Sequence, residues 1–400
     1  MSAKRIVLKG TKLLALLLVL ILLYVGSLMV VYSFPDEWIA HQVNAAVGVL
    51  AEEGNMPGGY AMYFWHDGIG ITDNLTDKEM YLGLLRNGRT TAEAAMRTDY
   101  SRYWHGYAVF LRPLSIALSI INIRYLNMMV MFSLFMLCYW HCRKQLGAWI
   151  AFAFAAGLLM SFILIAPFCQ QYTTVYLLTL LSCYVLLRFW KGLRHRLPEV
   201  FVIIGSLVCF FDFLTFPVLA LGYPLLLCLM LRIREGTSTR RLWQEWFILS
   251  ALWMAAYALT WMSKALCGTL FTGHNVLADI LEQVARRTTG AEGSVEITAL
   301  TAIEHNMKTF FIGSNIAFFG LALVVYAIYA LRRPKPFAEW MRALPVSVVS
   351  LYPFVWYCVL QNHVRMHFWM THKMLAISVF AELAFLALGR REMREDKPCN

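Results

Sequence analysis

The stretch that decides the fold of this chain is LLALLLVLILLYVGSLMVVYSFP, residues 13–35. These 23 residues carry no charge, and they follow a start that contains Lys4, Arg5, Lys9 and Lys12. The segment is long enough to cross a hydrocarbon core of roughly 30 Å as a helix, the form in which a backbone satisfies its own hydrogen bonds in lipid. It is too long for an ordinary cleaved signal peptide and lacks a small-residue cleavage site. It therefore predicts a membrane helix whose basic flank stays in the cytoplasm.

The composition of the whole chain agrees with this first helix. Hydrophobic residues make up 60% of the chain and charged residues only 15%, which is far from the balance of soluble globular domains. A net charge of +11 would indicate a nucleic-acid partner in a soluble protein, but here the Lys and Arg residues stand in short loops between apolar segments. We therefore expect one integral membrane domain over residues 1–400, with the lipid bilayer and not nucleic acid as its partner.

The apolar segments predict an all-α polytopic protein with about ten membrane helices, at residues 13–34, 124–142, 148–168, 173–190, 199–212, 217–232, 246–264, 311–331, 343–361 and 370–389. With the N-terminus inside, five successive loops or tails keep their basic residues on the cytoplasmic side. These residues are Arg143, Lys144, Lys191, Arg194, Arg196, Arg232, Arg234, Arg240, Arg241, Arg332, Arg333, Lys335, Arg390, Arg391 and Arg394. The even number of helices predicts that both termini of this inner or plasma membrane protein are cytoplasmic.

The segments 199–212 and 217–232 are short for full crossings of the membrane. We expect them to form a hairpin whose tip stops below the outer surface. Asp212 then lies at membrane depth, where a carboxylate needs a wet cavity or a partner. The sequence contains no internal repeat.

Polar residues concentrate in two outer segments, residues 36–122, which we expect to form amphipathic helices, and residues 265–310. In the first segment Asp36 and Glu37 follow Pro35 at the end of the first membrane helix. Two interpretations stay open for this pair. One carboxylate can act as a general base, or both are acids at a helix N-terminus after a proline.

A second group of acids follows in the same segment. Thr76 with Glu79 three residues later is the pattern of a helix-capping box. That pattern does not require Asp73, Asn74 and Asp77, which together are suited to bind a cation or a sugar hydroxyl.

An aromatic stretch completes the first outer segment. It includes Tyr103, Trp104 and His105, with Arg102 before them and Arg112 after them. Aromatic rings and Arg at a membrane interface are typical of an aromatic belt. The same residues also suit a carbohydrate and phosphate site, because rings stack on sugar faces and guanidinium groups bind phosphate.

The second outer segment and the last loop hold further cations. Lys264, Arg286 and Arg287 stand on the outer side against the usual charge trend, which indicates an anionic ligand such as a lipid phosphate. His363 and His367 share a helix face as metal ligands can. Because no third ligand follows at a fixed spacing, the pattern favours a cluster of hydrogen-bonding His, Arg and Lys side chains that faces a cavity. Its members are His363, Arg365, His367, His372 and Lys373.

A first helix, a long outer segment with acids near its start, many later spans and polar residues on the outer face together resemble the GT-C class of membrane glycosyltransferases. Four short pieces are similar to those of bacterial polytopic proteins related to that class: residues 73–77, residues 103–107 with Arg112-Pro113, residues 211–215, and Asn362-His363 with His367. The architectural resemblance covers nearly the whole chain.

The resemblance implies an inverting glycosyltransferase that takes a sugar from a polyprenyl-phosphate-linked donor to a cell-envelope glycan or lipid acceptor. It implies a base among Asp36, Glu37, Asp73 and Asp77. The residues expected to bind substrate are Asn74, Arg102, Tyr103, Trp104, His105, Arg112, Asp212, Lys264, Arg286, Arg287, His363, Arg365 and His367. Members of the class differ in their use of a divalent cation such as Mg²⁺ or Mn²⁺, and no single acidic motif of a named GT-C family is present.

Three other functions compete with this interpretation. A transporter or flippase of envelope precursors typically has inverted repeats and ionisable residues inside its spans. A polysaccharide polymerase or ligase would be expected to have its longest outer loop late in the chain, whereas here the first is longest. An accessory subunit with a degenerate site would need no specific carboxylate.

Overall fold

The computed structural model describes residues 3–56, 70–97, 101–273, 275–278, 281–282, 291–292, 295–296 and 298–390. In this part of the chain the fold is helical apart from one pair of two-residue antiparallel strands. The elements in chain order are α1 (Ala3–Tyr32), η1 (Asp36–Trp38), α2 (Ala40–Glu52), α3 (Asn74–Leu82), α4 (Thr91–Met96), α5 (Ala108–Leu114), α6 (Ile120–Leu146), α7 (Ala148–Met160), η3 (Ile163–Phe168), α8 (Gln170–Leu193), α9 (Leu197–Phe211), α10 (Leu219–Arg234), α11 (Thr239–Thr272), β1 (Ala291–Glu292), β2 (Val295–Glu296), α13 (Ala299–Phe310), α14 (Ser314–Leu331), α15 (Phe337–Val348), η4 (Val349–Leu351), α16 (Tyr352–Val359), α17 (Gln361–Met366), α18 (Phe368–Thr371), η5 (His372–Leu375) and α19 (Ala376–Leu388).

Seven helices of the described chain are long and apolar enough to cross a membrane, and this fits a polytopic membrane protein. They span Val7–Tyr32, Ile120–Leu146, Gln170–Leu193, Thr239–Thr272, Ser314–Leu331, Phe337–Val359 and Phe368–Leu388. The predicted count of about ten is not confirmed. The three remaining predicted spans correspond to α7, α9 and α10, which have only 13, 15 and 16 residues and so fall short of the roughly 20 that a crossing needs.

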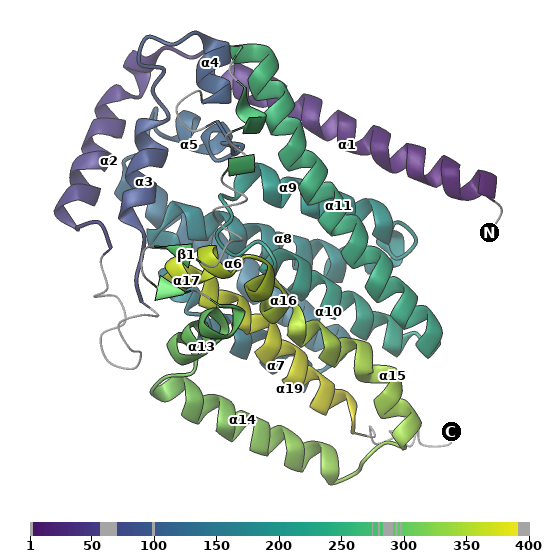
Figure 1. Cartoon of the computed structure of the whole chain (residues 1–400). Coiled ribbons are helices and arrows are strands. Elements are labelled where there is room, and N and C mark those ends of the chain that lie inside the picture. The colour runs from purple at the N-terminus through teal and green to yellow at the C-terminus, as the bar shows by residue number, and fades with distance from the viewer. Residues whose placement is uncertain are drawn as a thin grey trace, which may run out of the picture.

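The loops rich in Arg and Lys meet at one end of the helix bundle, which we call the basic end. There Arg194 pairs with Glu235 at 2.9 Å, and Arg342 donates to the backbone oxygen of Thr237 at 3.0 Å. Lys335 donates its backbone N–H to Gly389 at 2.8 Å. The basic ends of α8, α10, α14 and α19 therefore lie together at one end of the fold, on the same side of Figure 1 as the first turns of α1.

We call residues 36–122 the first polar segment. Its described residues fold into α2, α3, α4 and α5 beside the end of α1, at the opposite end of the bundle (Figure 1). The predicted capping box of Thr76 and Glu79 is wrong. The cap of α3 is Asp73, whose carboxylate accepts from the Thr76 backbone N–H at 2.9 Å. Aspartate is a better N-cap than threonine, and here it begins the helix three residues earlier. A capping box does occur at α4, between Thr90 and Glu93.

A chain of polar contacts attaches α1 to the rest of the bundle. The Tyr24 hydroxyl lies 3.0 Å from Ser206 Oγ on α9, and Ser206 Oγ lies 2.8 Å from Thr260 Oγ1 on α11. The indole N–H of Trp104 donates to the Thr260 backbone oxygen at 2.7 Å. Because these groups are buried, each needs the partner that the next helix supplies.

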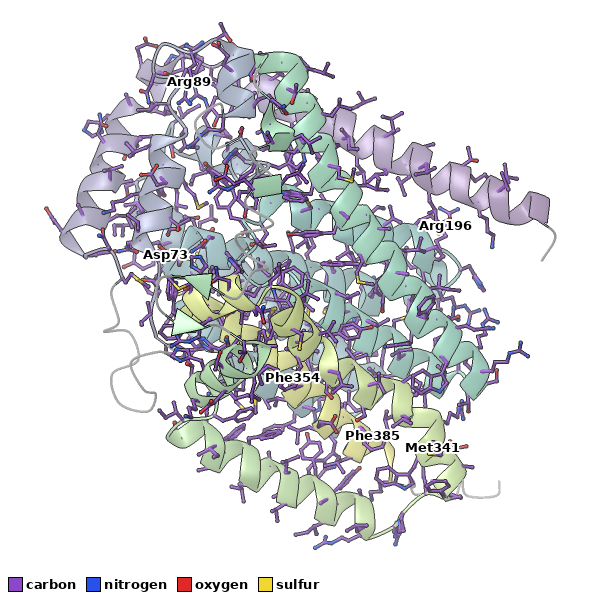
Figure 2. All side chains as sticks on the ribbon, in the orientation of Figure 1. Asp73, Arg89, Arg196, Met341, Phe354 and Phe385 are labelled. Carbon is purple, nitrogen blue, oxygen red and sulfur yellow. The ribbon has the colours of Figure 1, made fainter. Side chains whose placement is uncertain are left out.

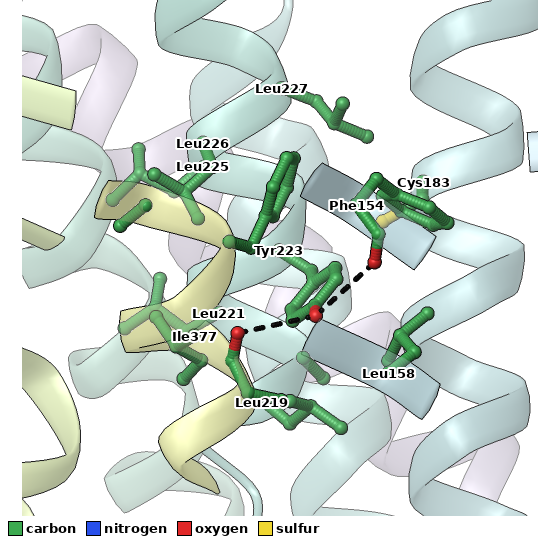
Figure 3. Close-up of a cluster of buried hydrophobic side chains, with 14 of the residues drawn as sticks. Phe154, Leu158, Cys183, Leu219, Leu221, Tyr223, Leu225, Leu226, Leu227 and Ile377 are labelled. Carbon is green, nitrogen blue, oxygen red and sulfur yellow. Dashed lines mark hydrogen bonds between the residues drawn. The ribbon is translucent and has the colours of Figure 1, made fainter. Parts of the chain in front are cut away.

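Close approach of backbones fixes the packing of the central helices α7, α10 and α19. Gly157 on α7 lies where a Cβ would meet both the Tyr223 hydroxyl and the Ala376 carbonyl oxygen. The Tyr223 hydroxyl donates to Phe154 O at 3.5 Å and to Ala376 O at 3.3 Å, inside a cluster of Leu side chains (Figure 3). Only a residue without a side chain permits this three-helix contact.

Gly157→Ala should lower the stability of the purified protein by about 1–3 kcal/mol, because the new methyl group has no space. Gly192→Ala on α8 is the matched control, since a Cβ there meets nothing within 4 Å. The measurement is the melting temperature of both variants in the same detergent. Equal melting temperatures would contradict the proposed packing of α7 against α19.

Candidate functional site

Two carboxylates of the first polar segment meet the start of α8. Asp77 accepts the backbone N–H of Gln170 at 2.8 Å and that of Gln171 at 3.3 Å. Asp73 accepts from the Gln171 side-chain amide at 3.0 Å. The first N–H groups of a helix have no partner inside the helix and carry partial positive charge, so a carboxylate is a favourable partner. The acids that the sequence singles out at residues 73–77 therefore join α3 to α8.

The environment of Asp77 changes its acidity. Its side chain is completely buried, and this burial raises its pKa to about 7; the nearby Asp73 charge adds to the rise, and the Gln170 and Gln171 N–H groups oppose it. A carboxyl with a pKa near neutrality is the kind of group that can accept and return a proton. The thiol of Cys169, 3.8 Å from Asp77 Oδ1, is also buried, and burial raises its pKa well above the usual range.

A partly buried ion pair between the end of α2 and α6 supports this region. The Arg124 guanidinium contacts both oxygens of Glu53, at 2.5 and 2.8 Å, and Asn74 donates to Glu53 Oε2 at 2.9 Å. Burial alone would raise the pKa of Glu53, but the hydrogen bond and charge of Arg124 hold it below the usual range. Asn74, predicted to bind substrate, thus contacts a protein carboxylate in this structure.

A lysine from η5, directly before α19, lies close to the same turn of α8. Lys373 is completely buried, donates to the Ser161 carbonyl oxygen at 3.3 Å and lies 5.2 Å from the centre of the Tyr172 ring. The Tyr172 hydroxyl donates to Ile71 O at 3.3 Å, two residues before Asp73. We call Asp73, Asp77, Gln170, Gln171, Tyr172 and Lys373 the α8 cluster.

The turn between α9 and α10 contacts two stretches that the sequence singles out, residues 103–107 and residues 361–367. Asp212 is buried and accepts the Thr215 backbone N–H at 3.1 and 3.2 Å, together with the Thr215 hydroxyl. Leu214 has a φ of 69°, an uncommon conformation for a residue with a side chain, and its carbonyl oxygen lies 2.8 Å from His363 Nε2. The Phe213 ring packs against His105 with ring centres 5.3 Å apart.

The aromatic stretch of residues 103–107 is buried in the protein. Tyr103, Trp104, His105 and Tyr107 each have at most 5% of their surface exposed. Rings of an aromatic belt lie at the surface toward the lipid headgroups, so the belt interpretation is wrong for these residues. They instead connect the first polar segment to the α9–α10 turn and to α11.

The buried Arg112 and the half-buried Asp36 form a second ion pair at the end of α1. Arg112 contacts Asp36 at 2.7 Å and also donates to the backbone oxygens of Val31, Phe34 and Leu84. Burial alone would raise the pKa of Asp36, but hydrogen bonds from Arg112 and from the Arg86 N–H hold it below the usual range. Glu37, the next residue, is exposed.

The other predicted cations and histidines are distributed more widely. Lys264 is buried and donates to Met96 O at 2.5 Å. The ring centres of His363 and His367 are 4.6 Å apart, and Arg365 is half-buried on the same short helix, α17. Among the described residues no group of three His, Cys, Asp or Glu side chains has an arrangement that could hold a metal ion. Arg286 and Arg287 lie outside the described residues.

Sequence reasoning overlooked Glu53, Arg124, Gln170 and Gln171, whereas it places Lys373 in the polar cluster of the last loop. A weak signal existed for the two glutamines, because the Gln170-Gln171 pair separates two apolar segments. No family model, no curated protein and no solved structure matches this chain, so the site is defined by its own contacts.

The raised pKa of Asp77 predicts a specific pH dependence of stability. Between the ordinary pKa of 3.8 and about 7, the folded protein binds a proton that the unfolded chain releases, so stability should fall as pH rises through this range. The effect is on the order of a few kcal/mol. The melting temperature of Asp77→Asn should depend less on pH between 4 and 8 than that of the wild type. Glu79→Gln, an exposed change on the same helix, should keep the wild-type slope; a wild-type slope in Asp77→Asn would contradict the assignment.

Replacing Arg112 should lower the free energy of unfolding far more than replacing Arg86, which contacts the same Asp36 carboxylate. Arg112→Met leaves buried carbonyl oxygens and Asp36 without their donor, at a cost of about 3 kcal/mol or more. Arg86→Met removes a pair in which the Arg86 side chain is 30% exposed, at a cost of at most about 1 kcal/mol. Thermal unfolding in detergent measures both variants. Similar losses would show that the Arg112 contacts add little.

Proposed function

We propose that this chain is a GT-C-type glycosyltransferase that moves a sugar from a polyprenyl-phosphate-linked donor to a cell-envelope glycan or lipid acceptor. In this proposal the basic end faces the cytoplasm of an inner or plasma membrane, as the positive-inside rule favours. Both termini are then cytoplasmic, and the α8 cluster lies toward the outer face.

The observation that carries the proposal is that two carboxylates and a lysine each contact the first turn of α8, the carboxylates at Gln170 and Gln171 and the lysine at the Tyr172 ring. Asp73 and Asp77 come from the first polar segment, Tyr172 from α8 and Lys373 from η5. Glycosyl transfer from a phosphate-linked donor needs a base for the acceptor hydroxyl and a cation for the departing phosphate. The α8 cluster contains both kinds of group.

The proposed chemistry uses these groups as follows. Asp77 takes the proton of the acceptor hydroxyl as the oxygen forms a bond to the anomeric carbon of the sugar. The bond from that carbon to the phosphate oxygen breaks, and the polyprenyl phosphate leaves as an anion next to Lys373. Attack opposite the leaving group inverts the anomeric centre. Asp73 and Gln171 position the region, since they are hydrogen-bonded to each other at 3.0 Å.

The test compares strains that lack this protein and are complemented with the wild type or with single variants. Asp77→Asn and Lys373→Met should reduce transfer at least about 100-fold, with loss of one glycan decoration and accumulation of a polyprenyl-linked sugar. Asp36→Asn, Glu37→Gln and Asp73→Asn test the other candidate bases. The readout is the cell-envelope glycan profile together with the polyprenyl-lipid profile.

Two controls separate catalysis from folding. Glu52→Gln and Glu79→Gln change exposed carboxylates of the same segment and should keep full activity. The amount of each variant in the membrane is measured, because Asp77→Asn also alters the start of α8. Full complementation by every carboxylate variant would exclude the proposed catalysis and favour a transporter or an accessory subunit.

A further inference from the structure

A cavity of about 360 Å³ lies at the basic end, where four connections meet. Its lining includes the start of α7, the end of α10, the start of α15 and the end of α19. The cations around it are Arg234, Lys335, Arg342 and Arg390, against the single carboxylate of Glu339. The cavity therefore has an excess of positive charge and lies apart from the α8 cluster.

The fold positions Arg342 and Arg390 through side-chain contacts and Lys335 through its backbone. Pro334 and Arg390 form a backbone bridge, and the Lys335 N–H donates to Gly389 O at 2.8 Å. The Arg390 guanidinium lies 4.1 Å from the centre of the Tyr329 ring. Arg342 binds the carbonyl oxygens of Ile233 and Thr237 and contacts Glu339 at 3.3 Å, so it neutralises the only carboxylate of the lining. Among the described residues, Arg234, Lys335 and Arg390 have no carboxylate within ion-pair distance.

An apolar groove begins where the cavity ends. It has a volume of about 210 Å³ and runs between α7 and α14, and Trp149 lines both spaces. The Trp149 and Tyr329 rings are 4.0 Å apart at the junction. Val325 and Leu321 on the groove side of α14 are 40% and 65% exposed in a helix that is apolar enough to span a membrane. The groove therefore has the character of a surface that contacts lipid chains.

We propose that the cavity and groove together bind an anionic phospholipid. The phosphate group would lie among Arg234, Lys335 and Arg390, and one acyl chain would follow the groove from Trp149 along α14. A free phosphate would satisfy the cations but leave the groove uncovered. Anionic phospholipids are the abundant anions of the cytoplasmic leaflet, and basic pockets between membrane helices on that side bind their headgroups. The inference depends on the membrane orientation but not on glycosyl transfer.

The test measures which lipids the purified full-length protein retains. Protein is exchanged into micelles that contain equal amounts of phosphatidylglycerol and phosphatidylcholine, and bound lipid is counted by native mass spectrometry. The wild type should retain phosphatidylglycerol in preference. In the triple variant Arg234→Gln, Lys335→Gln, Arg390→Gln, the ratio of bound phosphatidylglycerol to bound phosphatidylcholine should fall about tenfold or more. The reason is that each cation near the headgroup contributes to binding.

Matched control variants show whether a loss of lipid is specific to the cavity and the groove. The variant Lys144→Gln, Arg332→Gln, Arg333→Gln removes three exposed cations from the same end outside the cavity and should keep the preference. Val325→Trp fills the groove and should weaken retention, whereas Val324→Trp changes the adjacent, exposed position outside it and should not. The phospholipid assignment would be overturned by an equal loss of lipid in both triple variants or by the absence of a preference in the wild type. Retention of inorganic phosphate alone, or displacement of the phospholipid by undecaprenyl phosphate at equal concentration, would also overturn it.

Discussion

The carboxylate of Asp77 satisfies backbone N–H groups at the start of α8 that would otherwise have no partner inside an apolar bundle. Lipid supplies no hydrogen bonds, and a long apolar chain offers few side chains that do. The partner therefore comes from a different part of the sequence, the first polar segment. This requirement ties α3 to α8, and through Glu53 and Arg124 it also ties α2 to α6. The polar segment is thus part of the bundle and not a loose loop on it.

The same contacts that hold the fold also determine the chemistry of the α8 cluster. Burial raises the pKa of the Asp77 carboxyl, and the hydrogen bonds from the α8 N–H groups limit this rise. Asp36, by contrast, stays ionised because Arg112 and Arg86 surround it. Two carboxylates of the same segment therefore differ in acidity because they have different partners. In the proposed glycosyl transfer, this difference in acidity is the reason for assigning the base to Asp77 and a structural contact to Asp36.

The features of the fold that can be predicted from the sequence are those whose sequence signal lies in neighbouring residues. The charge-free run at residues 13–35 is local, and α1 forms over it. The break between residues 212 and 217 is also local, because Asp212 and Pro217 stand between two apolar runs. The cap of α3 cannot be chosen from the sequence, because Asp73 and Thr76 are both capable N-caps and only the bond from the Thr76 N–H to Asp73 distinguishes them. The long predicted span at 148–168 is instead the short helix α7 followed by η3, with Phe162 at a φ of 56° between them.

The contacts that define the α8 cluster were beyond sequence reasoning, because they join residues far apart in the chain. Lys373 reaches Tyr172 only because α19 packs against α7, where Gly157 lets the Ala376 carbonyl approach. In Figure 2, Asp73 lies at one side of the molecule and Arg196 and Met341 at the other. The helix α19 connects these sides, since Lys373 precedes it and Arg390 follows it. A close-packed interior does not deform continuously. The contact between Gly157 and Ala376 therefore positions the start of α19, and with it Lys373 three residues earlier.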